Sequence, residues 1–186
     1  MLIPIAILIV ALLAAIFGPQ LWARYILKHH SRHRDEIPGT GGELALHLIE
    51  NSKLEGVTVE KISEGDHYDP AGKIVRLSES VYDGKSLTAV VVSAHEVGHA
   101  IQDHLNYAPL KLRTRLVLLA GISERIGAMI LIALPFITAL TRLPATGAVM
   151  LISGLAVLLV PVAVHLITLP VEFDASFKRA LPILAL

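Results

Sequence analysis

Five consecutive residues, His95 to His99, have the types and spacing for hydrolytic chemistry, because their order H-E-V-G-H matches H-E-x-x-H. Positions four apart face the same side of a helix, so His95 and His99 can approach one Zn²⁺ ion at about 2.0–2.1 Å. Glu96 is rotated away from the metal but can reach a zinc-activated water as general base. These residues predict a catalytic zinc site; a structural helix with two stray histidines is the alternative.

A catalytic zinc site needs a third protein ligand and an open fourth position. The longer pattern H-E-x-x-H-x-x-G-x-x-H fails here, since Gln102 and Leu105 stand where glycine and histidine are required. His104 is the nearest alternative ligand in sequence. Asp103 lies one turn beyond His99, where it could accept a hydrogen bond from that histidine or simply end an exposed helix.

The elements that must position these residues are largely apolar. Hydrophobic residues make up 54% of the 186, and the mean hydropathy is +0.64, which favours a membrane protein. Three segments reach the roughly 20 residues that span a bilayer: Leu2 to Leu21, Leu116 to Leu140 and Gly147 to Leu169. The absence of cysteine excludes disulfides and thiolate ligands, and a net charge of zero gives no reason to expect nucleic acid.

A remote carboxylate, Glu172, follows the third predicted span in the segment LPVEFDASFKRA. Two spans separate Glu172 from His99, and an even number of crossings returns the chain to the side it left. Pro170 favours a break after the span, so that a new helix would carry Glu172. Glu172 is therefore the better candidate for the third ligand. His165, seven residues earlier on the same helical face, is a candidate partner for the site.

Lysine and arginine are unevenly distributed about the predicted spans. The first span is followed by four of them, Arg24, Lys28, Arg32 and Arg34, whereas the connector between the last two spans carries only Arg142. This bias predicts an outside amino terminus and a cytoplasmic polar segment from His29 to Leu110. His29, His30 and His33 extend the basic cluster, which suits anionic lipid headgroups better than a metal.

The polar segment predicts a small α-β-β-α arrangement. The spacing of Thr40 and Glu43 is that of a capping box at the start of a helix. Residues 57–62 and 73–78 alternate as strands and predict a hairpin with a long loop. The second strand, as an edge strand, would be able to pair with an extended peptide. A helix over residues 86–104 follows and carries the H-E-x-x-H residues.

Two blocks of the sequence, DHYDPAGKIVRLSESVYDGKSLTAVVVSAHEVGHAIQ and LPVEFDAS, resemble the YugP-like neutral zinc metallopeptidases, a bacterial membrane family, over roughly residues 39–180. The resemblance implies a gluzincin-type set of three zinc ligands and one general base. The ligands would be His95, His99 and Glu172, and the base Glu96.

The resemblance also directs attention to residues after the third ligand. In related membrane gluzincins an aspartate often follows that ligand by four residues. Here Ser176 occupies that place and Asp174 stands two residues on, so Asp174 is the candidate for a hydrogen bond to a ligand histidine. In the turn-rich loop, His67 or Tyr68 could stabilise an oxyanion, with a plain loop as the alternative.

The predicted fold class is α+β, mainly α, with a zincin-like α-β-β-α catalytic segment and three transmembrane helices. The expected parts are an anchor over residues 1–27, a catalytic domain over 28–110, two membrane helices over 111–169 and a ligand-carrying helix over 170–186.

Together these patterns predict a multi-pass zinc metalloendopeptidase of the bacterial inner membrane, with its active site on the cytoplasmic side. Its expected partners are protein or peptide substrates, including membrane proteins, and the lipid bilayer. One alternative is a catalytically inactive membrane metal-binding scaffold, against which the intact Glu96 argues. Another is a divalent-metal transporter, against which the position of the ligands outside the spans argues.

Overall fold

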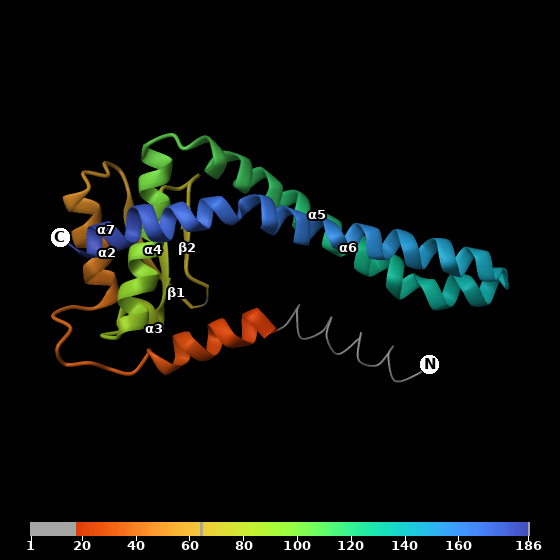
Figure 1. The fold of residues 1–186 in the computed structure, drawn as a ribbon, viewed down its shortest axis with the longest axis horizontal. Helices are drawn as coiled ribbons and strands as arrows, with labels where there is room; N and C mark the ends of the chain where they lie inside the picture. The colour runs from red at the N-terminus through yellow and green to blue at the C-terminus, as the bar shows by residue number, and fades with distance from the viewer. Residues whose placement is uncertain (1–17, 64, 186) are drawn as a thin grey trace. The chain divides into compact units, whose positions relative to one another are not determined.

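The computed structural model describes residues 18–63 and 65–185, which are mainly helical with one small sheet (Figure 1). The chain forms two compact units. One comprises the residues up to Ala100 together with Ala180–Leu186, and the other comprises Ile101–Arg179. The first predicted span, Leu2 to Leu21, lies almost wholly outside the described residues, so it stays a prediction.

Helix α2 (Gly41–Asn51) begins at the predicted capping box. The Thr40 backbone N–H donates to Glu43 Oε2 at 2.7 Å, and the Glu43 N–H donates to Thr40 Oγ1 at 3.2 Å. Two backbone donors at the helix start are thereby satisfied. The helix contacts β1 and α3 and buries an apolar stripe of Ala45, Leu48 and Ile49.

The sheet has three strands in the order β1-β3-β2: β1 (Thr58–Ile62), β2 (His67–Asp69) and β3 (Ile74–Ser78). Strand β3 pairs in parallel with β1 and antiparallel with β2. The predicted hairpin between the first and last strands is therefore wrong, since the hairpin is β2–β3. Asp69 ends β2 and its Oδ1 accepts from the N–H groups of Ala71 and Gly72, which closes the turn. Because β2 comes between β1 and β3 in the chain and runs antiparallel to β3, strands β1 and β3 run in the same direction.

Strand β3 is the middle strand, with Val75 and Leu77 fully buried on one face. The prediction that this strand lies at an edge and pairs with a peptide is wrong, because its backbone groups already bond to neighbours on both sides. The outer strands of the described sheet are β1 and β2.

Two helices follow the sheet. The short α3 (Glu79–Tyr82) was not expected, whereas α4 (Leu87–His104) matches the predicted motif helix to within one residue at its start. The α+β, mainly helical class is confirmed, although the predicted α-β-β-α order becomes α-β-β-β-α-α.

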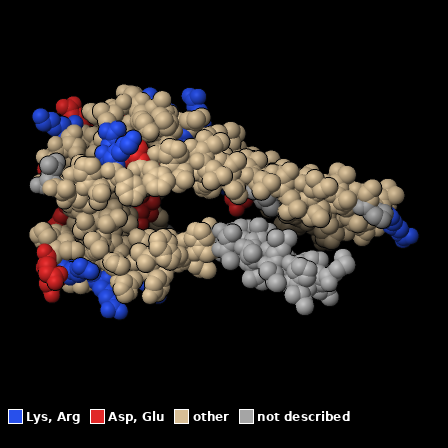
Figure 2. Space-filling model, viewed as in Figure 1, with Lys and Arg blue, Asp and Glu red and all other residues tan. Residues whose placement is uncertain are grey.

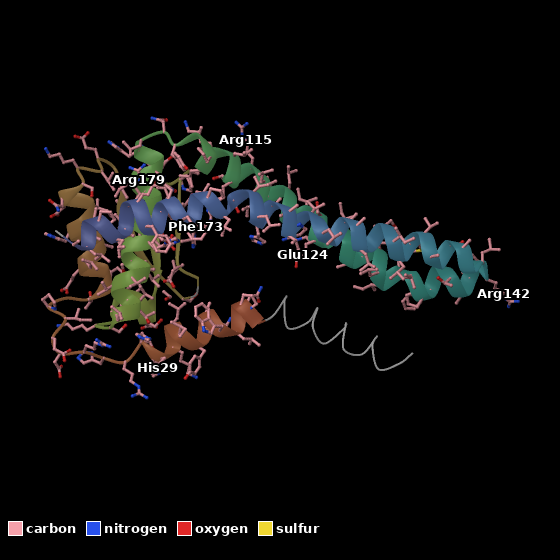
Figure 3. All side chains as sticks on the ribbon, in the orientation of Figure 1. His29, Arg115, Glu124, Arg142, Phe173 and Arg179 are labelled. Carbon is pink, nitrogen blue, oxygen red and sulfur yellow. The ribbon has the colours of Figure 1, made fainter. Side chains whose placement is uncertain are left out.

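The second unit contains a helical hairpin of α5 (Ala108–Thr141) and α6 (Pro144–Phe173), which lie side by side in Figure 1. Both helices are long and apolar enough to cross a membrane, in agreement with two of the predicted spans. Figure 2 shows few charged side chains along the hairpin. In Figure 3, Glu124 lies partway along it and Arg142 at its tip.

The chain does not break at Pro170. Helix α6 continues through Pro170 to Phe173, then becomes a π-helical stretch, η1 (Asp174–Ala180), and ends with α7 (Leu181–Leu184). The predicted break is wrong because proline is tolerated inside apolar helices where other groups satisfy the freed carbonyl. Glu172 is thus carried by the last turn of α6 itself.

Candidate metal centre

The two histidines of the motif lie on one face of α4. Their ring centroids are 4.7 Å apart and the rings are nearly perpendicular, at 79°. His99 is buried and His95 is partly exposed. This is the i, i+4 placement that the spacing predicted, and it leaves the pair accessible from the exposed side of His95.

Glu96 is buried next to this pair. Burial raises the pKa of its carboxyl group above the ordinary value, while His95, His99 and a hydrogen bond from the Tyr68 backbone act in the opposite direction. Asp66 adds a smaller effect that raises the same pKa. A carboxyl group whose pKa is moved toward neutrality is suited to accept and return a proton.

Glu172 is one-third exposed, and its Oε1 lies 2.7 Å from Arg113 Nε on α5. It directly precedes Phe173, which is labelled on α6 in Figure 3. A carboxylate has two oxygens, so the same group can pair with a guanidinium and offer an oxygen to a metal ion.

One donor atom each from His95, His99 and Glu172 lie within 4.8 Å of one another. Two imidazole nitrogens and a carboxylate oxygen form a donor set that catalytic zinc sites use, with a fourth position open for water or substrate. Donor atoms around tetrahedral zinc are about 3.3 Å apart, so the three side chains fit this ion after small rotations. The residues present thus suit zinc.

Sequence reasoning missed Gln102, whose side chain is fully buried. Its Nε2 donates to the Val171 carbonyl oxygen and to Asp174 Oδ2, each at 2.9 Å. Arg179 Nε also donates to Asp174 Oδ2, at 3.3 Å. Asp174, predicted as a partner of a ligand histidine, is therefore held by an amide and a guanidinium. The signal available in the sequence was that Gln102 stands one turn after His99.

The other residues considered as ligands or as partners of the ligands lie outside the group of three donor atoms. Asp103 is partly exposed on α4, His104 is exposed at its end and His165 is exposed on α6. Within residues 18–63 and 65–185, none of the three belongs to the group of donor atoms around His95. Tyr68 is buried on β2, where its backbone contacts Glu96.

Comparison with known proteins identifies the family of the chain. The family model described as "Putative neutral zinc metallopeptidase" matches residues 5–186, and the chain belongs to this family. The Bacillus subtilis (strain 168) protein named "Putative membrane protease YugP" is 34% identical over 179 residues, which are 92% of this chain and 75% of the relative. No solved structure matches the chain. The family and this relative support a protease-like role that involves zinc, and the two apolar helices agree with membrane association.

Proposed function

We propose that this protein is a membrane-embedded zinc endopeptidase, with His95, His99 and Glu172 as zinc ligands and Glu96 as general base. The observation that carries the proposal is the grouping of the three donor atoms next to the intact, buried Glu96. Membership of the metallopeptidase family supports it independently.

Contacts of Gln102 support Glu172 as the third ligand. Helix α4 is continuous through the motif, so Gln102 lies one turn beyond His99. Its amide nitrogen bonds the carbonyl of Val171, the residue before Glu172. The end of α6 is thereby attached to the helix that presents the two histidines.

The reaction proposed is hydrolysis of a peptide bond by water. Zinc, when bound, polarises the scissile carbonyl and makes water more acidic. Glu96 takes one proton from the attacking water and returns it to the amine nitrogen that leaves. The Tyr68 backbone hydrogen bond keeps the Glu96 carboxylate oriented between these two transfers.

The proposed location of the active site is the cytoplasmic face. The two helices of the α5–α6 hairpin run in opposite directions, so Glu172 and the start of α5 are on one side if both helices cross the bilayer. The basic residues near Arg24 and Arg34 favour the cytoplasm for that side. A reporter fused after Gly39 should be active only inside the cell; activity only outside contradicts this orientation.

The proposed substrates are proteins or peptides at the membrane surface, including membrane proteins. The partial exposure of His95 and the name of the relative, "Putative membrane protease YugP", support this proposal. The motif residues precede the apolar hairpin rather than lying inside it, which favours cleavage outside the hydrocarbon.

The test combines metal analysis with cleavage of unfolded protein by the full chain in detergent. Glu96→Gln should keep zinc and lose about 10²–10⁴-fold in rate, because only the base is removed. Glu172→Ala should lose zinc. Glu50→Gln, an exposed carboxylate on α2, is the control and should change neither.

Two outcomes would overturn parts of the proposal. Unchanged zinc in Glu172→Ala removes that residue from the ligand set, and equal cleavage by Glu96→Gln removes the general base. A wild-type protein that binds zinc through His95 and His99 yet cleaves no substrate supports the inactive scaffold instead.

A further inference from the structure

A second polar site lies far along the sequence from the zinc ligands. Residues 18–29 are helical and lead into a turn, where a cavity of about 310 Å³ is lined by five side chains. All five are histidines or arginines: His29, His30, Arg32, His33 and Arg34. His29 is labelled at this turn in Figure 3, and Figure 2 shows Lys and Arg side chains gathered there.

The turn is fixed by hydrogen bonds to the start of α4. The Thr88 N–H donates to the His30 carbonyl at 3.2 Å, and Thr88 Oγ1 donates to the Leu27 carbonyl at 2.7 Å. The Arg34 N–H donates to the Lys85 carbonyl at 2.9 Å. These bonds hold the backbone under the cavity, so a ligand meets a preformed site, and Lys85 lies beside it.

The charge of the cavity is largely uncompensated. Only His33 has a carboxylate contact, to Asp35 at 3.1 Å, and that aspartate side chain is fully exposed. Across the described part of the chain, neither Arg32 nor Arg34 forms an ion pair. Two guanidinium groups and three imidazoles line one cavity, and such N–H donors suit the oxygens of a phosphate group.

The helix over residues 18–29 indicates what kind of molecule carries the phosphate. Trp22 is 68% exposed and lies two turns before His29, and Tyr25 is 66% exposed and lies one turn before it. Leu21 is also exposed. Tryptophan and tyrosine of this kind are typical of the membrane–water interface. Tyr25 also stacks on His29, with ring centroids 6.1 Å apart. The cavity therefore follows directly after residues suited to the headgroup region.

We propose that this basic cavity binds the phosphate of an anionic phospholipid headgroup. The arginines contact the phosphate oxygens, and the aromatic residues lie beside the glycerol and upper acyl chains. Because Thr88 belongs to α4, the bound lipid holds the amino end of the motif helix at the membrane surface. This inference stands independently of peptide cleavage.

The test reconstitutes the full chain in phosphatidylcholine nanodiscs with spin-labelled phosphatidylglycerol or phosphatidylcholine as probe. The wild type should immobilise more phosphatidylglycerol than phosphatidylcholine. One cation near an anionic headgroup contributes about fivefold to this preference, so Arg32→Gln should lower it about fivefold and Arg32→Gln/Arg34→Gln should abolish it.

The matched control is Lys53→Gln/Lys73→Gln, which removes two exposed cations from the same unit and should leave the lipid preference intact. The unfolding temperature of each variant shows whether it folds. If the double variant does not fold, the lipid preference of the single Arg32→Gln variant is the test. An unchanged preference in Arg32→Gln overturns the proposal.

A second arm separates lipid from soluble phosphate. Inorganic phosphate is titrated into lipid-free protein in detergent and followed by phosphorus NMR. Phosphate binding that depends on Arg32, together with no preference for phosphatidylglycerol in nanodiscs, assigns the cavity to a soluble anion and overturns the lipid proposal. Phosphatidylglycerol preference that depends on Arg32 supports it.

Discussion

Gln102 donates a hydrogen bond to Asp174 at 2.9 Å and so connects two helices 72 residues apart in the sequence. The same amide nitrogen donates to the Val171 carbonyl at 2.9 Å. An amide has two N–H donors, and both are used here. Glu172 lies between the two residues that this amide holds, which makes Gln102 a positioning residue for the proposed third ligand.

Replacement of Gln102 by alanine should weaken zinc binding. The buried Asp174 would lose one donor, which costs about 1–3 kcal/mol, and the end of α6 would lose its attachment to α4. Partners that orient metal ligands typically contribute 10–100-fold in affinity, so a drop of that size is expected. Competition with a chromophoric chelator measures it.

The control is Gln20→Ala, an exposed glutamine on residues 18–29. It removes the same side chain without touching the site and should bind zinc as the wild type does. If Gln102→Ala retains wild-type affinity, Gln102 contributes packing only and does not position Glu172.

The α5–α6 hairpin should depend on Gly154. A Cβ atom there would lie 2.7 Å from the Leu131 side chain, so the helices approach closely at this position. Small residues permit such approach in membranes. Gly154→Ile should destabilise the hairpin by about 1–3 kcal/mol through overpacking.

Gly121 provides the matched control for the hairpin, because nothing lies within 4 Å of a Cβ atom built there. Gly121→Ile should leave the unfolding temperature in detergent unchanged or raise it slightly, since glycine is a poor helix former. If Gly154→Ile and Gly121→Ile lower the unfolding temperature equally, the loss of stability does not come from packing between the two helices.

Local patterns were predicted from the sequence with success. The motif helix and the capping box of Thr40 and Glu43 depend on residues within one or two turns of each other, and the structure has both. The apolar lengths of α5 and α6 were also sufficient to predict them. In each case the determinant and its consequence lie in the same segment.

Features that depend on distant partners were predicted less well. Strand β2 is only three residues long and lies among turn residues, so the parallel pairing of β1 with β3 was not visible. In the sequence, Gln102 stands out only as the position where the longer pattern H-E-x-x-H-x-x-G-x-x-H requires glycine. Its role depends on Asp174, 72 residues away, which no local pattern encodes.

The start of α2 should be sensitive to Thr40. Its hydroxyl oxygen accepts the Glu43 N–H at 3.2 Å, and alanine would leave that donor without its cap. Loss of an N-cap of this kind costs about 1 kcal/mol, which lowers the unfolding temperature of a chain this size by about 2–4 °C. Thr40→Ser retains the hydroxyl and should be neutral; a matching loss in Thr40→Ser would argue against capping.

The β2–β3 turn should make stability depend on pH through Asp69. Hydrogen bonds from the Gly72 N–H and from Arg76 hold the pKa of the Asp69 carboxyl group below its usual range, although burial acts in the opposite direction. Arg76 Nη1 lies 2.8 Å from Asp69 Oδ2, and about a quarter of each side chain is exposed. Because the folded-state pKa is lowered, the stabilisation is complete above the unfolded pKa and is lost as pH falls through the folded value.

Asp69→Asn keeps an oxygen for the turn but removes the charge, so at pH 7 it should cost no more than about 1 kcal/mol, as expected for a partly exposed ion pair. The difference from wild type should shrink as pH falls below about 4 and the wild-type carboxylate takes up a proton. Thermal unfolding of both forms between pH 2 and pH 7 measures this. Glu55→Gln, which alters an exposed carboxylate in the same unit, is the control and should match wild type throughout. A difference for Asp69→Asn that grows toward low pH would contradict the assignment.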